Sequence, residues 1–340
     1  MEKLFIEKKE WEKFIKNKLE QYTIYAPFKA GENLHFSIVK SENVGEIVYN
    51  GARCVEPLKI FFFPFKERIV PQIENLSEIV IMGATNCDIT ALGILDKVFR
   101  EGDYKDPNYL RRRENSIIIS FDCQKVYESC FCEIVGVHPY GEKNFDLNLT
   151  YIEEGFVIEV GSEKGKNFIG RSAKFYQANQ SQLEKREDIR KKMVEKVKEI
   201  NKDFKIENIP DAIKGAYETE LWKDIKDIEN CVQCGSCTSN CPSCVCFLLE
   251  DTSSDEEFFK KMKIWDSCLF PGYARMASGA TPRPTLYDRY ANRLLCKYWY
   301  MVENFGMVGC TGCGRCIAGC IGKIDKRKVL SEFLKVKERK

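Results

Sequence analysis

A cysteine pattern that occurs twice near the C-terminus constrains this chain more than any other feature. Residues 231–242 read CVQCGSCTSNCP and residues 310–321 read CTGCGRCIAGCI, so both copies contain the spacing C-x2-C-G-x-C-x3-C. Of the 17 cysteines in the 340 residues, twelve lie in residues 231–320 and the other five in residues 1–132. The fold therefore has to hold two equivalent sets of thiols, and the C-terminal third carries the most distinctive chemistry.

This spacing is typical of a ferredoxin-type pair of [4Fe–4S] clusters. Three cysteines at positions i, i+3 and i+6 of a glycine-containing loop can each bind one iron of the same cube. The fourth cysteine begins a departing helix and faces away, so in a two-cluster arrangement it binds the other cluster. The predicted ligands are Cys231, Cys234, Cys237 and Cys320 for the first cluster, and Cys241, Cys310, Cys313 and Cys316 for the second.

Zinc is the main alternative for these thiols. A zinc ribbon uses two C-x2-C pairs, four thiolates in all, whereas each copy here adds a third and a fourth cysteine that zinc does not need. Gly235 and Gly314 occupy the same loop position, where a side chain would crowd a cluster or block a positive φ angle. We therefore favour iron–sulfur clusters, and a zinc-stabilised binding scaffold is the competing hypothesis from another class.

Four of the five N-terminal cysteines form a further candidate site. Cys87 closely follows a predicted strand at 79–82, and Cys123 follows another at 117–121, with Cys130 and Cys132 shortly after it. If these two strand ends meet at one edge of a sheet, the four thiols come together. We favour a third [4Fe–4S] cluster at Cys87, Cys123, Cys130 and Cys132 over burial by chance.

The other candidate residues have weaker patterns. Cys244, Cys246 and Cys268 could hold an additional metal centre with an outside ligand, which would make the chain a self-sufficient enzyme. Burial is favoured for these three and for Cys54 and Cys296, because free cysteine is among the most buried residue types. The two histidines, His35 and His138, have no triad or metal-ligand context, so structural roles are expected for both.

Composition and missing motifs limit the function classes. Lys and Arg total 53 against 51 Asp and Glu, which leaves no basic surface typical of nucleic-acid or membrane binding. The chain contains neither G-x-G-x-x-G after a strand nor G-x4-G-K-[ST] nor H-E-x-x-H. Without a flavin or nicotinamide site, the chain is expected to carry single electrons between other proteins rather than to catalyse a reaction. No catalytic residue is predicted.

The expected location is the cytoplasm. Residues 1–10 contain no apolar core of a signal peptide, and the longest apolar run, at 60–65, is too short to span a bilayer. In a reducing compartment, thiols are more often metal ligands than disulfides.

The expected fold class is α+β. We predict a mixed α/β domain in residues 1–175, a helical linker in 176–225 and an α-helical ferredoxin-like domain with both clusters in 226–335. Strands are expected at 34–39, 79–82, 117–121 and 156–160. Helices are expected at 3–22, at 89–99 with Asp88 as N-cap, at 181–204, at 255–265 and at 287–304.

Several segments outside the two cysteine copies resemble one known family. The most specific are Cys87-Asp88, Cys130-Phe131-Cys132, Cys244-Val245-Cys246 and Trp265-Asp266-Ser267-Cys268, together with PLKIFFFP at 57–64. The chain resembles the beta, iron–sulfur subunit of soluble NAD(P)-linked [NiFe] sulfhydrogenases, and also its relative, the iron–sulfur subunit of anaerobic sulfite reductase. Ile321 departs from the family pattern, which usually has proline there.

The resemblance implies an electron-transfer subunit of a larger oxidoreductase. Its partners would be a flavin-containing subunit that handles NAD(P)H and a catalytic NiFe hydrogenase subunit. In the alternative, an anaerobic sulfite reductase, a siroheme subunit would take the place of the NiFe subunit as the acceptor.

Overall fold

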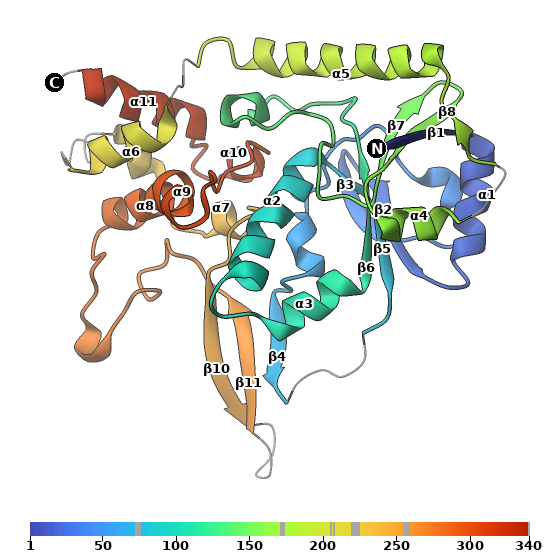
Figure 1. Cartoon of the computed structure of the whole chain (residues 1–340). Helices are drawn as coiled ribbons and strands as arrows, with labels where there is room; N and C mark the ends of the chain where they lie inside the picture. The colour runs from blue at the N-terminus through green and yellow to red at the C-terminus, as the bar shows by residue number, and fades with distance from the viewer. Residues whose placement is uncertain are drawn as a thin grey trace.

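An eight-stranded mixed sheet organises the N-terminal half of the chain (Figure 1). The computed structural model describes residues 1–71, 76–170, 174–204, 206, 208–218, 225–253 and 259–338. The strands in spatial order are β3 (Asn33–Ile38), β2 (Thr23–Ala30), β5 (Ile79–Ala84), β6 (Ser116–Phe121), β7 (Leu147–Ile152), β8 (Gly155–Val160), β1 (Glu2–Glu7) and β9 (Tyr176–Gln177). All four strands expected from the sequence are present.

The centre of this sheet is parallel, and this positions the N-terminal cysteines. Strand β5 pairs in parallel with both β2 and β6, and β6 pairs in parallel with β7. Ala84 at the end of β5 lies opposite Ser120 near the end of β6. The segments that leave these strands, with Cys87 and Cys123, therefore start side by side at one edge of the sheet.

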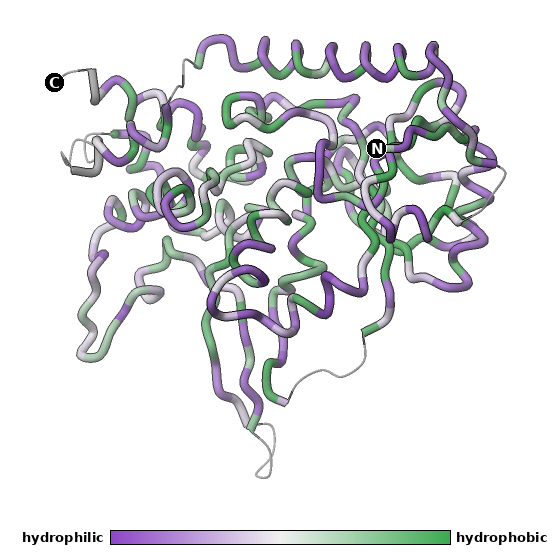
Figure 2. The backbone as a smooth tube through the Cα atoms, in the orientation of Figure 1, coloured by the Kyte–Doolittle hydropathy of each residue, from purple (hydrophilic) through white to green (hydrophobic). Residues whose placement is uncertain are grey.

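Helices cover both faces of the sheet, as expected for a mixed α/β arrangement. On one face, helices α1 (Lys8–Lys18) and α4 (Glu163–Ile169) place Trp11 and Phe168 in a core with residues of the central strands. On the other face, α2 (Asn86–Asp96), the π-helical turn Lys97–Glu101 and α3 (Pro107–Glu114) pack through a second core. Figure 2 shows hydrophobic residues concentrated along the central strands.

Two local predictions for this half are corrected by the structure. Residues 2–7 form strand β1 rather than the start of a helix, because they pair with β8 and bury Leu4, Phe5 and Ile6. Helix α2 begins at Asn86 with Thr85 as N-cap residue, so Asp88 is not the cap. Instead, Asp88 is buried and forms an ion pair with Arg315.

A long helix, α5 (Gln180–Ile200), connects the sheet to the C-terminal region along one side of the molecule (Figure 1). It starts with a reciprocal capping box between Asn179 and Gln182. Its inward side chains include Arg190, which forms ion pairs with the buried Asp122 and Glu159. The helix predicted at 181–204 is confirmed.

The C-terminal region is mainly helical and has its own core, which includes Ile213, Leu294 and Phe333. Leu286–Tyr300 runs without a break through α8 and a π-helical turn, so the helix predicted at 287–304 is confirmed. The helical elements are α6 (Ile209–Glu218), α7 (Ser236–Ser239), α8 (Leu286–Leu295), the π-helical turn Cys296–Tyr300, α9 (Met301–Phe305), α10 (Arg315–Ala318) and α11 (Lys326–Glu338). Short 3-10 turns are Val44–Glu46, Leu58–Phe61, Cys132–Val135, Lys226–Asn230 and Ala277–Gly279.

A second, three-stranded sheet contains segments from both halves of the sequence. Its strand order is β10 (Phe247–Ser253), β11 (Phe259–Trp265) and β4 (Lys66–Val70), all antiparallel. The helix expected at 255–265 is therefore wrong for residues 259–265, and residues 254–258 lie outside the described residues. Strand pairing on both sides, together with the buried ion pair of Lys263 and Glu67, overrides the local helical pattern.

Candidate iron–sulfur centres

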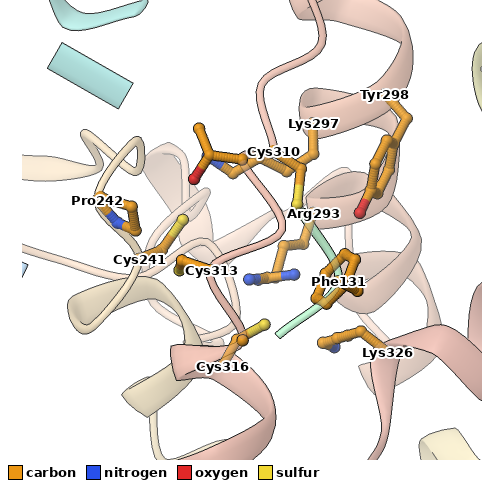
Figure 3. Close-up of a pocket in the computed structure, with 12 residues that line it drawn as sticks. Phe131, Cys241, Pro242, Arg293, Lys297, Tyr298, Cys310, Cys313, Cys316 and Lys326 are labelled. Atoms are coloured by element: carbon orange, nitrogen blue, oxygen red, sulfur yellow. The ribbon is translucent and has the colours of Figure 1, made fainter. Parts of the chain in front are cut away.

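One pocket collects the four cysteines predicted to bind the second cluster (Figure 3). Its lining also includes Phe131, Arg293 and Tyr298. We call the four cysteines of this pocket the second site: Cys241, Cys310, Cys313 and Cys316.

Glycines allow the loop of the second site to approach its neighbours closely. Gly312 has a φ angle of +63° and Gly314 one of +74°, a region that L side chains rarely adopt. A Cβ atom on Gly312 would lie 2.4 Å from the Cα atom of Cys132, and one on Gly314 would lie 2.1 Å from the carbonyl oxygen of Ser129. The loop therefore packs directly against residues 129–132 of the N-terminal half.

The other copy of the pattern has the same local structure. Gly235 has a φ angle of +72° and precedes α7, just as Gly314 precedes α10. The two short helices are in contact, and Ser236 Oγ donates a hydrogen bond of 2.9 Å to the carbonyl oxygen of Gly319. The predicted ligand sets require the two copies to lie side by side, because the fourth cysteine of each copy binds the cluster of the other copy. The contact between α7 and α10 meets this requirement.

The first site is defined by the remaining four predicted ligands: Cys231, Cys234, Cys237 and Cys320. Cys231, Cys237 and Cys320 all pack against the C-terminal core. Burial raises the pKa of the Cys231 thiol, and the nearby Cys237 and Cys320 thiols add to that shift. The structure describes all 17 cysteines, and among them only Cys234 is exposed.

A second pocket collects the four N-terminal cysteines, which we call the N-terminal site: Cys87, Cys123, Cys130 and Cys132. The pocket is also lined by His138. The parallel pairing of β5 and β6 brings Cys87 and Cys123 together, and the loop after β6 supplies the other two.

The N-terminal site and the second site share a wall. Cys313 lines both pockets. The backbone N–H of Phe131 donates a hydrogen bond of 2.8 Å to the carbonyl oxygen of Gly312, which fixes the two loops against each other. Phe131 itself lines the second-site pocket, while its neighbours Cys130 and Cys132 line the other.

Burial shifts the pKa of several thiols at the second site and the N-terminal site. Burial raises the pKa of Cys132 and of Cys316 to about 12, and raises the pKa of Cys87 and Cys123 well above their usual range. Cys241 differs, because a hydrogen bond from a neighbouring thiol lowers its pKa. Binding of iron must therefore displace protons from the other thiols, since the thiolate is the metal ligand.

Within the described ranges, no three His, Cys, Asp or Glu side chains converge closely enough to hold one metal ion.

Sequence reasoning missed the charged and aromatic residues of the second site. Arg293, Lys297 and Lys326 line its pocket, and Tyr298 forms a hydrogen bond with the Cys310 thiol. Burial lowers the pKa of Lys326 to about 8. The spacing of four between Arg293 and Lys297 was the available signal, but it equally suits a solvated helix face.

The remaining cysteines fall into two groups. Cys54 is buried in a small separate core. The other four, Cys244, Cys246, Cys268 and Cys296, lie near the second site, where the thiols of Cys246 and Cys268 form a hydrogen bond with each other. Cys244 and Cys268 are buried, as expected from the sequence.

The paired cysteine loops define the class of the C-terminal region. Residues 230–324 match the 4Fe-4S dicluster domain family. The chain is also 31% identical over 317 residues to sulfhydrogenase 2 subunit beta of Pyrococcus furiosus, a match that covers 91% of each chain. The chain belongs to the family of sulfhydrogenase beta subunits, as the resemblance predicted.

Two further comparisons complete the description. No solved structure matches the chain. Among the described residues, no helix combines the length and the apolar character needed to cross a membrane.

Proposed function

We propose that this chain is the electron-transfer subunit of a hydrogenase and carries three [4Fe–4S] clusters, at the first site, the second site and the N-terminal site. The relative from Pyrococcus furiosus is by its name a subunit of a sulfhydrogenase. Such clusters accept and donate single electrons. The proposed partners are a flavin-containing subunit that handles NAD(P)H and a catalytic NiFe subunit.

The main observation behind this proposal is that each of the three cysteine sets lies next to another one. Cys313 lines both the second-site pocket and the N-terminal pocket, and the two cysteine copies pack through α7 and α10. The N-terminal site, the second site and the first site thus follow one another through the molecule. A relay needs such an order, whereas a zinc scaffold does not.

The residues of the chain have distinct tasks in this proposal. The loops of the second site and the N-terminal site pack against each other through Phe131 and Gly312, and the partly buried surroundings would strengthen electrostatic effects on the clusters. Exposed Cys234 places the first site at the surface, where a partner can approach. The proposed domains are residues 1–175, with the N-terminal site, and residues 226–335, with the other two.

The test is the iron and acid-labile sulfide content of the anaerobically purified chain, with low-temperature EPR. About twelve iron per chain supports three clusters, and about eight restricts the relay to the two C-terminal sites. Whole-number zinc without iron would overturn the proposal and favour the scaffold.

A further inference from the structure

Three buried basic side chains line the second site, Arg293, Lys297 and Lys326, and the inference concerns the first two. Arg293 is 5% exposed and Lys297 is 3% exposed. Arg293 Nη2 donates to the carbonyl oxygen of Cys237 at 2.8 Å, and Lys297 Nζ donates to Ser243 Oγ at 2.8 Å. In the part of the chain that the structure describes, neither cation forms an ion pair with a carboxylate, and Arg293 Nε has no hydrogen-bond partner.

Such an arrangement is costly unless negative charge lies nearby. A buried, unpaired cation is strongly destabilising even after its surroundings relax. Figure 3 shows the Arg293 guanidinium among the sulfur atoms of Cys310, Cys313 and Cys316. Among the described residues that line the pocket, cysteine thiolates are the groups that can supply the compensating charge, so the two cations are arranged for an anionic centre at the second site.

The N-terminal site has a different charge balance. Its neighbouring carboxylates are paired: Asp88 with Arg315 at 2.8 Å and Asp122 with Arg190 at 2.7 Å. These pairs are buried and formally neutral.

The N-terminal pocket is also lined by Arg53, which is partly buried, and by Lys125, which is exposed. The two sites that share Cys313 therefore differ in how deeply their cations are buried, because Arg293 and Lys297 are almost fully buried at the second site.

We propose that Arg293 and Lys297 hold the reduction potential of the second site above that of the N-terminal site. Reduction adds one negative charge to a cluster, and a fixed positive charge in a poorly polarisable surrounding stabilises that added charge. The inference rests on the proposed function, because it assigns a role toward the clusters placed there. Arg293 and Lys297 act only through their fixed positive charges and form no bond with iron.

The test is a redox titration of the full chain, purified anaerobically with its clusters and followed by low-temperature EPR. Arg293→Met is expected to lower the midpoint potential of one C-terminal signal by about 59 mV or more, a tenfold change for one electron. Arg293→Lys keeps the charge and is expected to restore most of the shift. The EPR signal of the N-terminal site is identified by its loss in Cys87→Ala. Its midpoint potential is expected to be the same in Arg293→Met as in wild type.

Two results would overturn the inference. One is an unshifted potential in Arg293→Met with full iron content, and the other is a wild-type N-terminal signal at higher potential than the second site. If Arg293→Met binds less iron than wild type, Lys297→Met and Lys297→Arg are titrated instead. The inference then requires a lowered midpoint potential in Lys297→Met and its recovery in Lys297→Arg. A wild-type chain without iron would instead overturn the proposed function.

Discussion

At the scale of single residues, the geometry of the candidate sites depends on glycines as much as on the cysteine thiols. Gly312 and Gly314 have positive φ angles and touch the backbone of residues 129–132. Gly136 also has a positive φ, of +73°, but nothing lies within 4 Å of the position of its Cβ. A substitution at Gly136 therefore reports the cost of backbone strain alone. A substitution at Gly312 or Gly314 reports that strain together with the loss of a close contact.

Gly314→Ala is expected to destabilise the chain more than Gly136→Ala. Both changes force an L residue into the left-handed region, which costs about 1–2 kcal/mol. Only at Gly314 does the new methyl group also collide with the Ser129 carbonyl oxygen, 2.1 Å away. Urea unfolding under anaerobic conditions measures both, and equal losses would show that the contact between the loops contributes nothing.

Cys87→Ala is expected to remove the N-terminal cluster and leave the other two. Iron content should fall by about four from about twelve per chain, because one ligand of a four-iron cluster is lost. Cys54→Ala is the matched control, since Cys54 is only 1% exposed but lies outside both cysteine pockets. Equal iron in wild type and Cys87→Ala would contradict the three-cluster assignment.

At the scale of elements, ion pairs and strand pairing join the two halves of the chain. Arg315 at the start of α10 donates to both carboxylate oxygens of Asp88 in α2, with side chains 2% and 1% exposed. Strand β4 from the N-terminal half completes the sheet of β10 and β11. These contacts fix the loop of the second site against the sheet that carries the N-terminal site.

Asp88→Ala is expected to destabilise the chain by about 3–5 kcal/mol, because it leaves the Arg315 cation buried and unpaired. Glu10→Ala, which removes the surface ion pairs with Lys13 and Lys174, is expected to destabilise the chain much less, because water screens surface ion pairs. Chemical denaturation of both variants with clusters bound gives the comparison. Similar losses in the two would show that the buried pair does not hold the halves together.

At the scale of the whole molecule, four of the eight cysteines of the first and second sites pack against the core of the C-terminal region. Cys231, Cys237, Cys310 and Cys320 pack against the same apolar cluster as Leu294. The large sheet has separate cores on its two faces. The stability of the two regions should therefore respond differently to iron.

Removal of iron is expected to loosen residues 226–335 while the sheet stays folded. Ligand binding at about 100 times its dissociation constant stabilises a fold by about 2.7 kcal/mol. We therefore expect amide exchange in α8 and α11 to accelerate by ~100-fold or more in the iron-free chain, with strands β1 and β8, which carry no cysteine of the three sites, much less affected. Hydrogen exchange with mass spectrometry measures this, and uniform acceleration would contradict the proposed domains.

The sequence by itself determined the cysteine pattern, the central strands, helix α5 and the family. Local spacing was sufficient there, because ligand loops and alternating apolar strands are short-range features. The strand at β1, the β10–β11–β4 sheet and the Asp88–Arg315 pair required the tertiary structure, because each depends on partners far away in the chain. The same holds for Arg293 and Lys297: only folding buries them without carboxylates, and burial rather than spacing gives their charges an effect on the second site.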